Sequence, residues 1–245
     1  MTKSKRTKTV KTPEVTVILT GYNEGKGLLR NLRKVKRILD STRLKWEIIL
    51  WDDKSGDDTA RIFSEFAGRK KNIRFFQNEK NLGRGATVKN ALKKARGRMV
   101  GYIDTDLELS PIYLPEFVFS LKDGSDMAIA KRIYAVGASN FLRAVLSRAY
   151  VFLVNRLLGI NLSDTEAGFK FFKKAKIMPV VKKIKDNRWF FDTEIVVRSV
   201  WRGLKVTEIP VVYVYDPQKA SSVNILTDTI IYFKKLLEFR KERPH

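Results

Sequence analysis

The chain has 245 residues, of which 44% are hydrophobic and 11% aromatic, so it is long and apolar enough to bury a core. It contains no Cys and a single His, His245, which excludes disulfides, thiolate nucleophiles, metal sites built on Cys or His, and Ser-His-Asp catalysis. The net charge of +23 predicts attraction to anions such as nucleotides, nucleic acid or an anionic membrane face.

The first part of the chain alternates short apolar runs with segments of helical spacing. The predicted strands are 15–20, 46–51, 73–76 and 99–103, and the predicted helices between them are 28–39, 59–66 and about 86–95. Alternation of this kind predicts an α/β fold with a mostly parallel central sheet and helices on both faces. In such sheets ligands bind beyond the carboxyl ends of the strands.

The pattern loosens after about residue 110. Further helices are predicted at 114–121, 140–158, 175–184, 191–201 and 226–240, and further extended segments at 127–130, 169–172 and 205–215. No repeat or low-complexity linker divides the chain. We therefore expect a flexible basic arm over 1–13, one catalytic domain over 14–222, and a C-terminal amphipathic helix over 223–245 that can lie at a membrane interface.

No segment has the length and composition of a membrane span. The longest stretch without charge covers only residues 133–142, against the roughly 20 apolar residues that a spanning helix needs. The basic start runs into polar Thr rather than an apolar segment, which predicts no signal peptide.

Acidic residues follow three of the predicted strands, although the chain as a whole is basic. Tyr22-Asn-Glu24 follows the first strand, Asp52-Asp53 ends the second, and Asp104-Thr-Asp106 follows the fourth. Because the carboxyl ends of parallel strands meet at one edge of a sheet, we expect these residues to line one cleft.

Asp104 and Asp106 stand two residues apart directly after a predicted buried strand, and Glu108 follows them. Carboxylate oxygens at this spacing suit Mg²⁺ or Mn²⁺, which takes one or two protein carboxylates and completes its shell with phosphates and water. Such an ion would neutralise the charge that grows on a departing nucleotide. The pattern therefore predicts a nucleotide-activated substrate and a metal site on Asp104 and Asp106, with Glu108 as a third ligand.

Two further segments suit a nucleotide. The ring of Tyr22 can stack on a base, and Asp52-Asp53 can contact the base or the ribose hydroxyls. The glycines of Asn81-Leu-Gly-Arg-Gly85 allow the backbone to approach a ligand, with Arg84 available for a phosphate. The alternative for Asp52-Asp53 is an N-cap of the helix that starts near Thr59.

Five segments together resemble the family 2 inverting glycosyltransferases of GT-A fold. They are 15–24, 46–55, 81–86, 102–106 and 163–170, which read VTVILTGYNE, WEIILWDDKS, NLGRGA, YIDTD and SDTEAGFK. Within that family, residues 14–222 look like the polyprenyl-phosphate (dolichyl-phosphate) glucosyl- and mannosyltransferases. The resemblance implies transfer of a hexose from UDP-glucose or GDP-mannose to a polyprenyl phosphate.

The resemblance also implies roles for single residues. Positions that hold the nucleoside part of the donor are matched by Tyr22, Glu24 and Asp53. The acidic pair that holds the sugar nucleotide and its metal is matched by Asp104 and Asp106, with Glu108 where relatives often have Gln. Lys219 lies where relatives place a basic residue on a loop that closes over the donor.

Basic residues match the positions around the phosphates. Arg132 matches a basic position near the phosphates, which implies a catalytic role and a contact to the acceptor phosphate. Arg143 and Ser147 resemble the pair that receives the acceptor lipid's phosphate. The chain departs from the pattern at Thr20, where relatives have Pro, and at Ser222-Val-Asn224, where relatives often have Ser-Lys-Leu. The segments 164–170 and 188–194 look closer to the glucosyltransferase branch.

A phosphate acceptor needs no strong general base, because it is already an anionic nucleophile, and positioning supplies most of the rate. In-line attack then inverts the anomeric centre. For a hydroxyl acceptor a carboxylate must remove a proton, and Asp164 is the predicted base. In the first case Asp164 belongs to the wall of the site, and a structural capping role is the alternative.

A lipid acceptor requires that the protein reach the bilayer surface. The segment 141–158 combines apolar residues with Arg, and 226–240 places apolar residues beside Lys and Arg. We expect peripheral association with the cytoplasmic face of an anionic membrane, with or without a separate membrane-anchoring protein. The alternative is that each helix packs on the sheet.

Other classes of function remain open from the residues alone. They are a glycosyltransferase with a soluble hydroxyl acceptor, a nucleotidyltransferase on a related sheet, and a basic nucleic-acid-binding protein. Because the basic residues are dispersed and no nucleic-acid-binding module is recognisable, we expect no nucleic acid partner.

Overall fold

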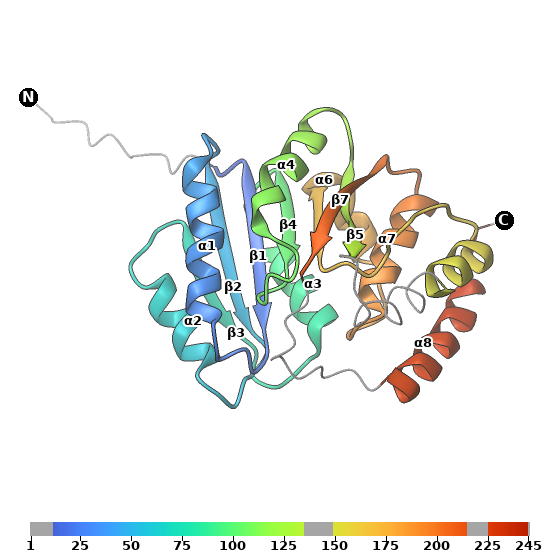
Figure 1. Cartoon of the computed structure of the whole chain (residues 1–245), viewed down its shortest axis with the longest axis horizontal. Coiled ribbons are helices and arrows are strands. Elements are labelled where there is room, and N and C mark those ends of the chain that lie inside the picture. Colours follow the sequence, from blue (N-terminus) through green and yellow to red (C-terminus); the bar gives the residue numbers. More distant parts are fainter. Residues whose placement is uncertain (1–11, 135–148, 215–224, 245) are drawn as a thin grey trace, which may run out of the picture.

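Strands from all parts of the chain form a seven-stranded sheet in the order β3-β2-β1-β4-β6-β5-β7 (Figure 1). This computed structural model describes residues 12–134, 149–214 and 225–244. The strands are β1 (Val15–Gly21), β2 (Trp46–Asp52), β3 (Ile73–Gln77), β4 (Met99–Ile103), β5 (Met127–Tyr134), β6 (Phe169–Lys173) and β7 (Val206–Tyr213).

The sheet is mostly parallel, as the alternation of strands and helices predicted. β3, β2, β1 and β4 pair in parallel, and so do β5 and β7. β6 is the exception, since it runs antiparallel to both β4 and β5. Its register pairs Tyr102 with Lys170 and Ile103 with Phe169, which brings the segment before β6 against the carboxyl end of β4.

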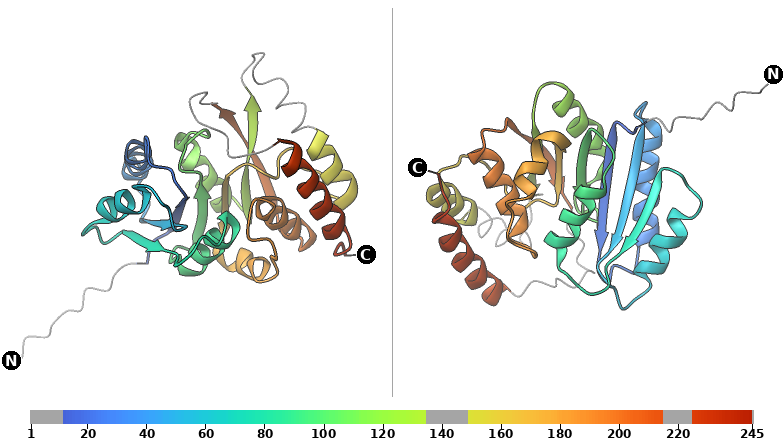
Figure 2. Two further views of the ribbon diagram at one scale, coloured as in Figure 1. Left: turned by 90° about the horizontal axis from the view of Figure 1, so that it is seen from below. Right: turned by 180° about the vertical axis from the view of Figure 1, so that it is seen from behind.

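Helices cover both faces of the sheet (Figure 2). One face packs on α1 (Leu28–Ser41), α2 (Thr59–Ala67) and α4 (Leu114–Lys122), which follows the short 3₁₀ helix η1 (Pro111–Tyr113). The other face packs on α3 (Arg84–Lys94), α6 (Lys174–Val181) and α7 (Phe191–Trp201). In α1 the buried side chains recur at helical spacing, at Leu28, Leu32, Val35 and Leu39, which is why this segment forms an amphipathic helix against a sheet.

A third apolar cluster lies outside α7. It joins α7 to α8 (Ile225–Arg240) and to the helix at 149–158, through side chains such as Val154, Leu158, Val197, Leu236 and Phe239. The predicted C-terminal helix is therefore present, and one of its sides packs on the protein.

One predicted element differs from the structure, and two others lie partly outside the described residues. β5 extends to Tyr134 because it pairs in parallel with the full length of β7, so Arg132 lies within a strand and not after one. Of the helix predicted over 140–158, only 149–158 lies within the described residues. Of the predicted basic arm, residues 1–11 lie outside them.

Candidate active site

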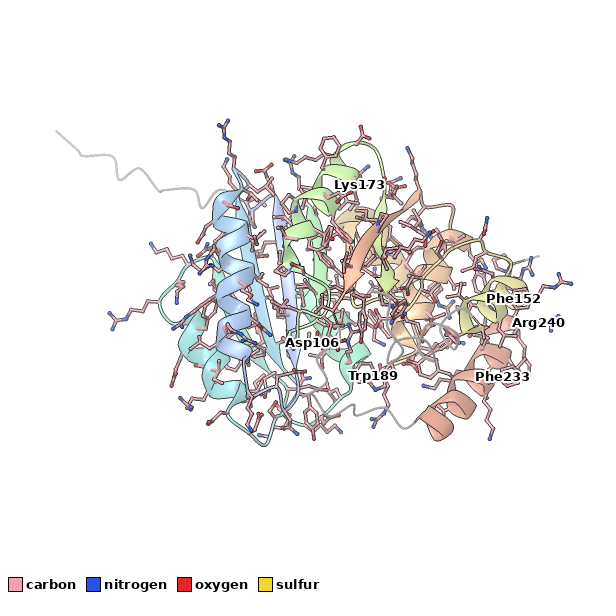
Figure 3. The ribbon with its side chains drawn as sticks, in the orientation of Figure 1. Asp106, Phe152, Lys173, Trp189, Phe233 and Arg240 are labelled. Carbon is pink, nitrogen blue, oxygen red and sulfur yellow. The ribbon has the colours of Figure 1, made fainter. Side chains whose placement is uncertain are left out.

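The polar segments that follow β1, β2 and β4 meet at one edge of the sheet, because these three strands are adjacent and parallel. Figure 3 shows Asp106 at this edge, whereas Lys173, at the end of the antiparallel β6, lies at the opposite edge. The predicted cleft at the strand ends thus has the location that the topology requires.

The segments after β1 and β2 are tied together by hydrogen bonds. The backbone N–H of Asn23 donates to Ser55 Oγ (2.9 Å), Asn23 Oδ1 accepts from the N–H of Gly56 (2.8 Å), and the N–H of Glu24 donates to Thr59 Oγ1 (2.8 Å). Asn23 has a φ of 56°, which redirects the chain after β1. The ring of Tyr22 is left half exposed beside this junction. Its stacking on a nucleoside base stays a prediction, as does the donor contact of Glu24.

Asp53 is buried and anchors the turn that leads into α3. Its two oxygens accept the N–H groups of Leu82 and Gly83 (2.9 Å each), and one also accepts from Asn78 Nδ2 (2.7 Å). Asp52 instead binds Ser55 and Gln77, so neither residue caps α2. A nucleoside bound by Asp53, as predicted, would share a carboxylate whose two oxygens already accept hydrogen bonds from backbone N–H groups.

The pocket at the end of β4 is lined by carboxylates and one guanidinium. Its lining residues are Ile103, Asp104, Asp106, Glu108, Leu109, Arg132, Glu166, Ala167, Gly168 and Tyr213. The structure therefore brings together Asp104, Asp106, Glu108 and Arg132, which were all predicted from the sequence. It adds Glu166, which was not.

Local contacts explain how the pocket wall is held. The N–H of Asp104 donates to the carbonyl of Gly168 (3.0 Å), and a Cβ at position 168 would overlap the Asp104 carboxylate, so only glycine fits there. Asn31 of α1 donates to the carbonyls of Thr105 (2.9 Å) and Asp106 (3.2 Å). These contacts fix the backbone of the Asp104-Thr-Asp106 segment from both sides.

Arg84 lies behind the pocket and joins two carboxylates. Its Nη2 is 2.5 Å from Asp104 Oδ1, and its Nη1 contacts Asp192 Oδ2. Asp192 also accepts from Tyr102 Oη (2.6 Å) and from Lys170 Nζ (2.8 Å). The sequence predicted that Arg84 would hold a phosphate, whereas the structure places it in an ion-paired network.

Burial and neighbouring charges shift the pKa values of two groups in this network. Complete burial lowers the pKa of Lys170, against the opposing charge of Asp192. Desolvation, together with Asp106 and Asp192, raises the pKa of Asp104, against the opposing charge of Arg84. Such perturbed groups in a pocket mark candidate functional sites.

Asp164 is locked by Arg132. Arg132 Nε and Nη2 donate to the two Asp164 oxygens (2.6 and 3.0 Å), and the N–H groups of Glu166 and Ala167 donate to Asp164 Oδ1. Burial alone would raise the pKa of Asp164, but the Arg132 guanidinium holds it below the ordinary value. A carboxylate with this arrangement is a weak proton acceptor, which argues against the predicted role of Asp164 as a base.

Glu166 is the carboxylate of this segment that lines the pocket. Its Oε2 is 3.7 Å from Arg132 Nη2. Burial raises the pKa of Glu166 to about 6, with Asp164 and Asp192 adding to the shift and Arg132 opposing it. Glu166 is therefore better suited than Asp164 to exchange a proton near neutral pH.

The predicted metal ligands lie in one pocket but do not form a ready-made cage. Within residues 12–134, 149–214 and 225–244, no group of three Asp, Glu, His or Cys side chains could hold a metal ion. A site with one or two protein carboxylates and substrate phosphates fits better. The excess of negative charge supports it: the cationic side chains of the site are Arg84, Arg132 and Lys170, and its carboxylates are Asp104, Asp106, Glu108, Asp164, Glu166 and Asp192.

Several predicted residues lie outside the described part of the chain, namely Arg143, Ser147 and Lys219, together with the departure at 222–224. Conversely, Lys170, Asp192 and Glu166 belong to the site although no role was predicted for them. One signal was available: Lys170 stands among phenylalanines in a predicted strand, and such an apolar run indicates a buried cation that needs a partner.

Comparison with known proteins finds similarity to glycosyltransferases. The model of the family "Glycosyl transferase family 2" matches residues 16–180. "Glycosyltransferase AglD" of Haloferax volcanii is 32% identical over 222 residues, which are 89% of this chain and 35% of that protein. "Dolichyl-phosphate beta-glucosyltransferase ALG5D" of Trichomonas vaginalis is 28% identical over 214 residues, which are 80% of this chain and 64% of that protein.

Among solved structures, glucosyl-3-phosphoglycerate synthase of Mycobacterium tuberculosis in complex with Mn²⁺ and UDP-glucose is similar with a TM-score of 0.69 at 17% identity. The match covers 95% of this chain and 80% of that one, and it shows a shared GT-A fold. The chain spans about a third of the length of the AglD relative and under two thirds of the ALG5D relative. In the described residues, no helix has the length and apolar character to cross a bilayer.

Proposed function

Because the chain belongs to glycosyl transferase family 2, we propose that it is an inverting hexosyltransferase with a nucleotide-sugar donor and a polyprenyl (dolichyl) phosphate acceptor. The observation that carries this proposal is the pocket at the end of β4, where Asp104 and Asp106 face Arg132 and Glu166 at the ligand-binding edge of the sheet.

We propose UDP-glucose or GDP-mannose as the donor, and Mg²⁺ or Mn²⁺ as the ion that accompanies it. Asp104 and Asp106 would hold the ion, which when bound neutralises charge on the departing diphosphate. The half-exposed ring of Tyr22 would stack on the base. The Mycobacterium synthase of the same fold is described with Mn²⁺ and UDP-glucose, which supports this assignment without deciding the donor.

A lipid phosphate would supply the nucleophile itself. Its oxygen forms the new bond to the anomeric carbon while the bond from that carbon to the nucleotide's phosphate oxygen breaks, and the nucleoside diphosphate leaves. The protein's task is then to hold the two anions in line. Arg132 supplies positive charge in the pocket, and Arg143 and Ser147 are the further residues proposed to receive the acceptor phosphate.

The relatives support a lipid acceptor by their names, since two from Trichomonas vaginalis are called dolichyl-phosphate beta-glucosyltransferases. The second candidate is a hydroxyl acceptor, and one observation favours a base for it. Glu166 lines the pocket with its pKa raised to about 6 by burial, so it could take the hydroxyl proton.

We further propose that the protein works on an anionic membrane surface such as the cytoplasmic leaflet, with or without a separate anchoring protein. Two helices, α8 and the helix at 149–158, which we call the outer helices, expose the large hydrophobic side chains of Phe152, Leu153, Ile231, Phe233 and Leu237. Figure 3 shows Phe152, Phe233 and Arg240 at the same end of the molecule. Exposed basic residues accompany them, namely Arg156, Lys234, Arg240 and Lys241. Residues 14–222 would then form the catalytic domain and 223–245 its membrane-contacting helix.

The test is a donor and acceptor screen. UDP-glucose, GDP-mannose and UDP-N-acetylglucosamine are each supplied with Mg²⁺ or Mn²⁺, using polyprenyl phosphate in anionic vesicles or a water-soluble alcohol as acceptor. We expect one donor to yield a polyprenyl phosphate hexose and a nucleoside diphosphate. Turnover with the soluble alcohol alone would contradict the lipid phosphate acceptor and support the hydroxyl acceptor. Release of pyrophosphate would contradict both hypotheses.

A further inference from the structure

Arg84 occupies a fixed position between the pocket and the protein interior. It is the first residue of α3, and the start of that helix contacts the first residue of α7 and the segment before it. The N–H of Ala86 donates to the carbonyl of Asn187 (3.0 Å), and a Cβ on Gly85 would lie 2.6 Å from the Cβ of Phe191. The guanidinium also lies over the ring of Tyr102, with its carbon 5.4 Å from the ring centre. Its side chain is only 12% exposed.

The two carboxylates that Arg84 joins differ in their surroundings. Asp192 is 5% exposed as a side chain and is held in place by Lys170 and Tyr102. Asp104 is 43% exposed and lines the pocket. One planar guanidinium therefore links an immobile interior anion to the carboxylate that the proposed function assigns to a divalent ion. The fork of donors on arginine makes this bridging possible, whereas a single ammonium group would not span both partners.

A cation that binds Asp104 meets a competitor already in place. Arg84 contacts Asp104 Oδ1, so an incoming ion must share that carboxylate with it or replace it. Asp192 affects this competition because it pairs with the same guanidinium. The more strongly Asp192 attracts Arg84, the weaker is the ion pair between Arg84 and Asp104. Lys170 contacts Asp192 but is not among the ion-pair partners of Asp104.

We propose that Arg84 and Asp192 are positioning residues that set the divalent-cation affinity of Asp104: Arg84 competes for the Asp104 carboxylate, and Asp192 limits that competition. The inference rests on the proposed function only in taking Asp104 as a cation ligand. Its consequence is that Asp192 influences cation binding through Arg84, in addition to the direct effect of its own charge on Asp104.

The experiment is a double-mutant cycle read by Mn²⁺ binding, with free Mn²⁺ measured by electron paramagnetic resonance, with and without UDP. The proteins are wild type, Arg84→Met, Asp192→Asn and the double variant. We expect Arg84→Met to tighten Mn²⁺ binding about five- to tenfold, as for the loss of a partly buried ion-pair competitor. Asp192→Asn should weaken binding at least about threefold more in the wild-type background than in the Arg84→Met background, where only its direct charge effect on Asp104 remains.

A plain charge effect gives a different pattern, since removal of the Asp192 charge would then weaken binding equally in both backgrounds. That result would overturn the inference, and so would an Arg84→Met protein with unchanged affinity. If wild type binds Mn²⁺ and Arg84→Met does not tighten it, the inference fails while the proposed metal site stands. If no protein of the cycle binds Mn²⁺, with or without UDP, both fail together.

A second comparison covers the case in which Asp192→Asn does not fold. Lys170→Met also removes a buried positive charge, yet Lys170 pairs with Asp192 and not with Asp104. We expect its effect on Mn²⁺ affinity to be at least about fivefold smaller than that of Arg84→Met, and equal effects would contradict the inference. Arg61→Met, on the exposed surface of α2, is the control that should change nothing. Circular dichroism and melting curves confirm that each variant is folded.

Discussion

In most proteins charged side chains are exposed and hydrophobic side chains are buried. Two regions depart from this rule in opposite ways: the pocket at the end of β4, and the outer surface formed by α8 and the helix at 149–158. The pocket region buries charge, with Lys170 fully buried and Asp192 only 4% exposed. The outer helices expose hydrophobic rings, with Phe152 at 67% and Phe233 at 45%. Buried charges cost stability unless they are paired, and exposed aromatic rings gain free energy only when something covers them.

The two regions are therefore suited to different kinds of partner. In the pocket the charges are held by short ion pairs across α3, β6 and α7, so the site is rigid and suited to a small anionic substrate with a cation. On the outer helices the apolar side chains project from an already packed pair of helices, so they suit a broad apolar phase. The following changes separate these two roles.

Asp106→Asn should have the largest effect, because it removes a charge that the proposed cation needs. We expect kcat for hexose transfer to fall at least about 100-fold, a size typical of the loss of electrostatic transition-state stabilisation. The measurement is the initial rate at saturating donor and Mg²⁺. Asp40→Asn, on the exposed end of α1, is the matched control and should retain its rate. A fully active Asp106→Asn enzyme would remove the metal from the mechanism.

Asp192→Asn should have the largest effect on stability. It leaves Lys170 buried without a carboxylate and takes one partner from Arg84, so the free energy of unfolding should fall by about 3–5 kcal/mol. Urea unfolding measures this loss. Asp58→Asn, whose ion pair with Arg61 is on the surface, should change stability by less than about 1 kcal/mol. Equal losses in the two variants would mean that the pocket network contributes nothing special.

A double change, Phe152→Ser with Phe233→Ser, tests the outer surface. The partition of the protein onto anionic vesicles should weaken at least about tenfold, because two rings no longer enter the interface, while the melting temperature stays within about 2 °C. Vesicle sedimentation gives the partition coefficient. Phe119→Ser on α4 is the control, since that ring is 66% exposed but lies on another helix. If the control weakened binding equally, membrane contact would not be specific to these two helices.

The smallest effect is a pH dependence from Glu166. Its pKa is raised to about 6 in the folded protein from an ordinary 4.5, so between these values the folded state holds more protons than the unfolded state. The contribution of Glu166 to stability is therefore present below about pH 4.5 and is lost as the pH rises through about 6. Glu166→Gln should gain about 1–2 kcal/mol over the wild type between pH 4.5 and 7, measured by urea unfolding at each pH. A constant difference between the two proteins would mean that Glu166 titrates normally.

Much of the fold follows from local pattern. The apolar runs at β1, β2, β3 and β4 and the helical spacing between them predict a parallel sheet without any tertiary information, and the boundaries of α7 at residues 191 and 201 agree with the prediction. The strand ends then bring Asp104 and Asp106 to the binding edge by topology alone. These features are predictable because each depends on residues close together in the sequence.

The α/β class, the edge at which a ligand would bind and the residue types available there all follow from the order of residues along the chain. Other features became visible only in three dimensions: β6 runs antiparallel beside β4, Arg84 pairs with Asp192 across 108 residues, and Glu166 lines the pocket while Arg132 is paired with Asp164. The physical reason is that buried charges choose partners by distance in space. Which carboxylate a given cation reaches depends on strand order and register, which no local pattern in the chain encodes.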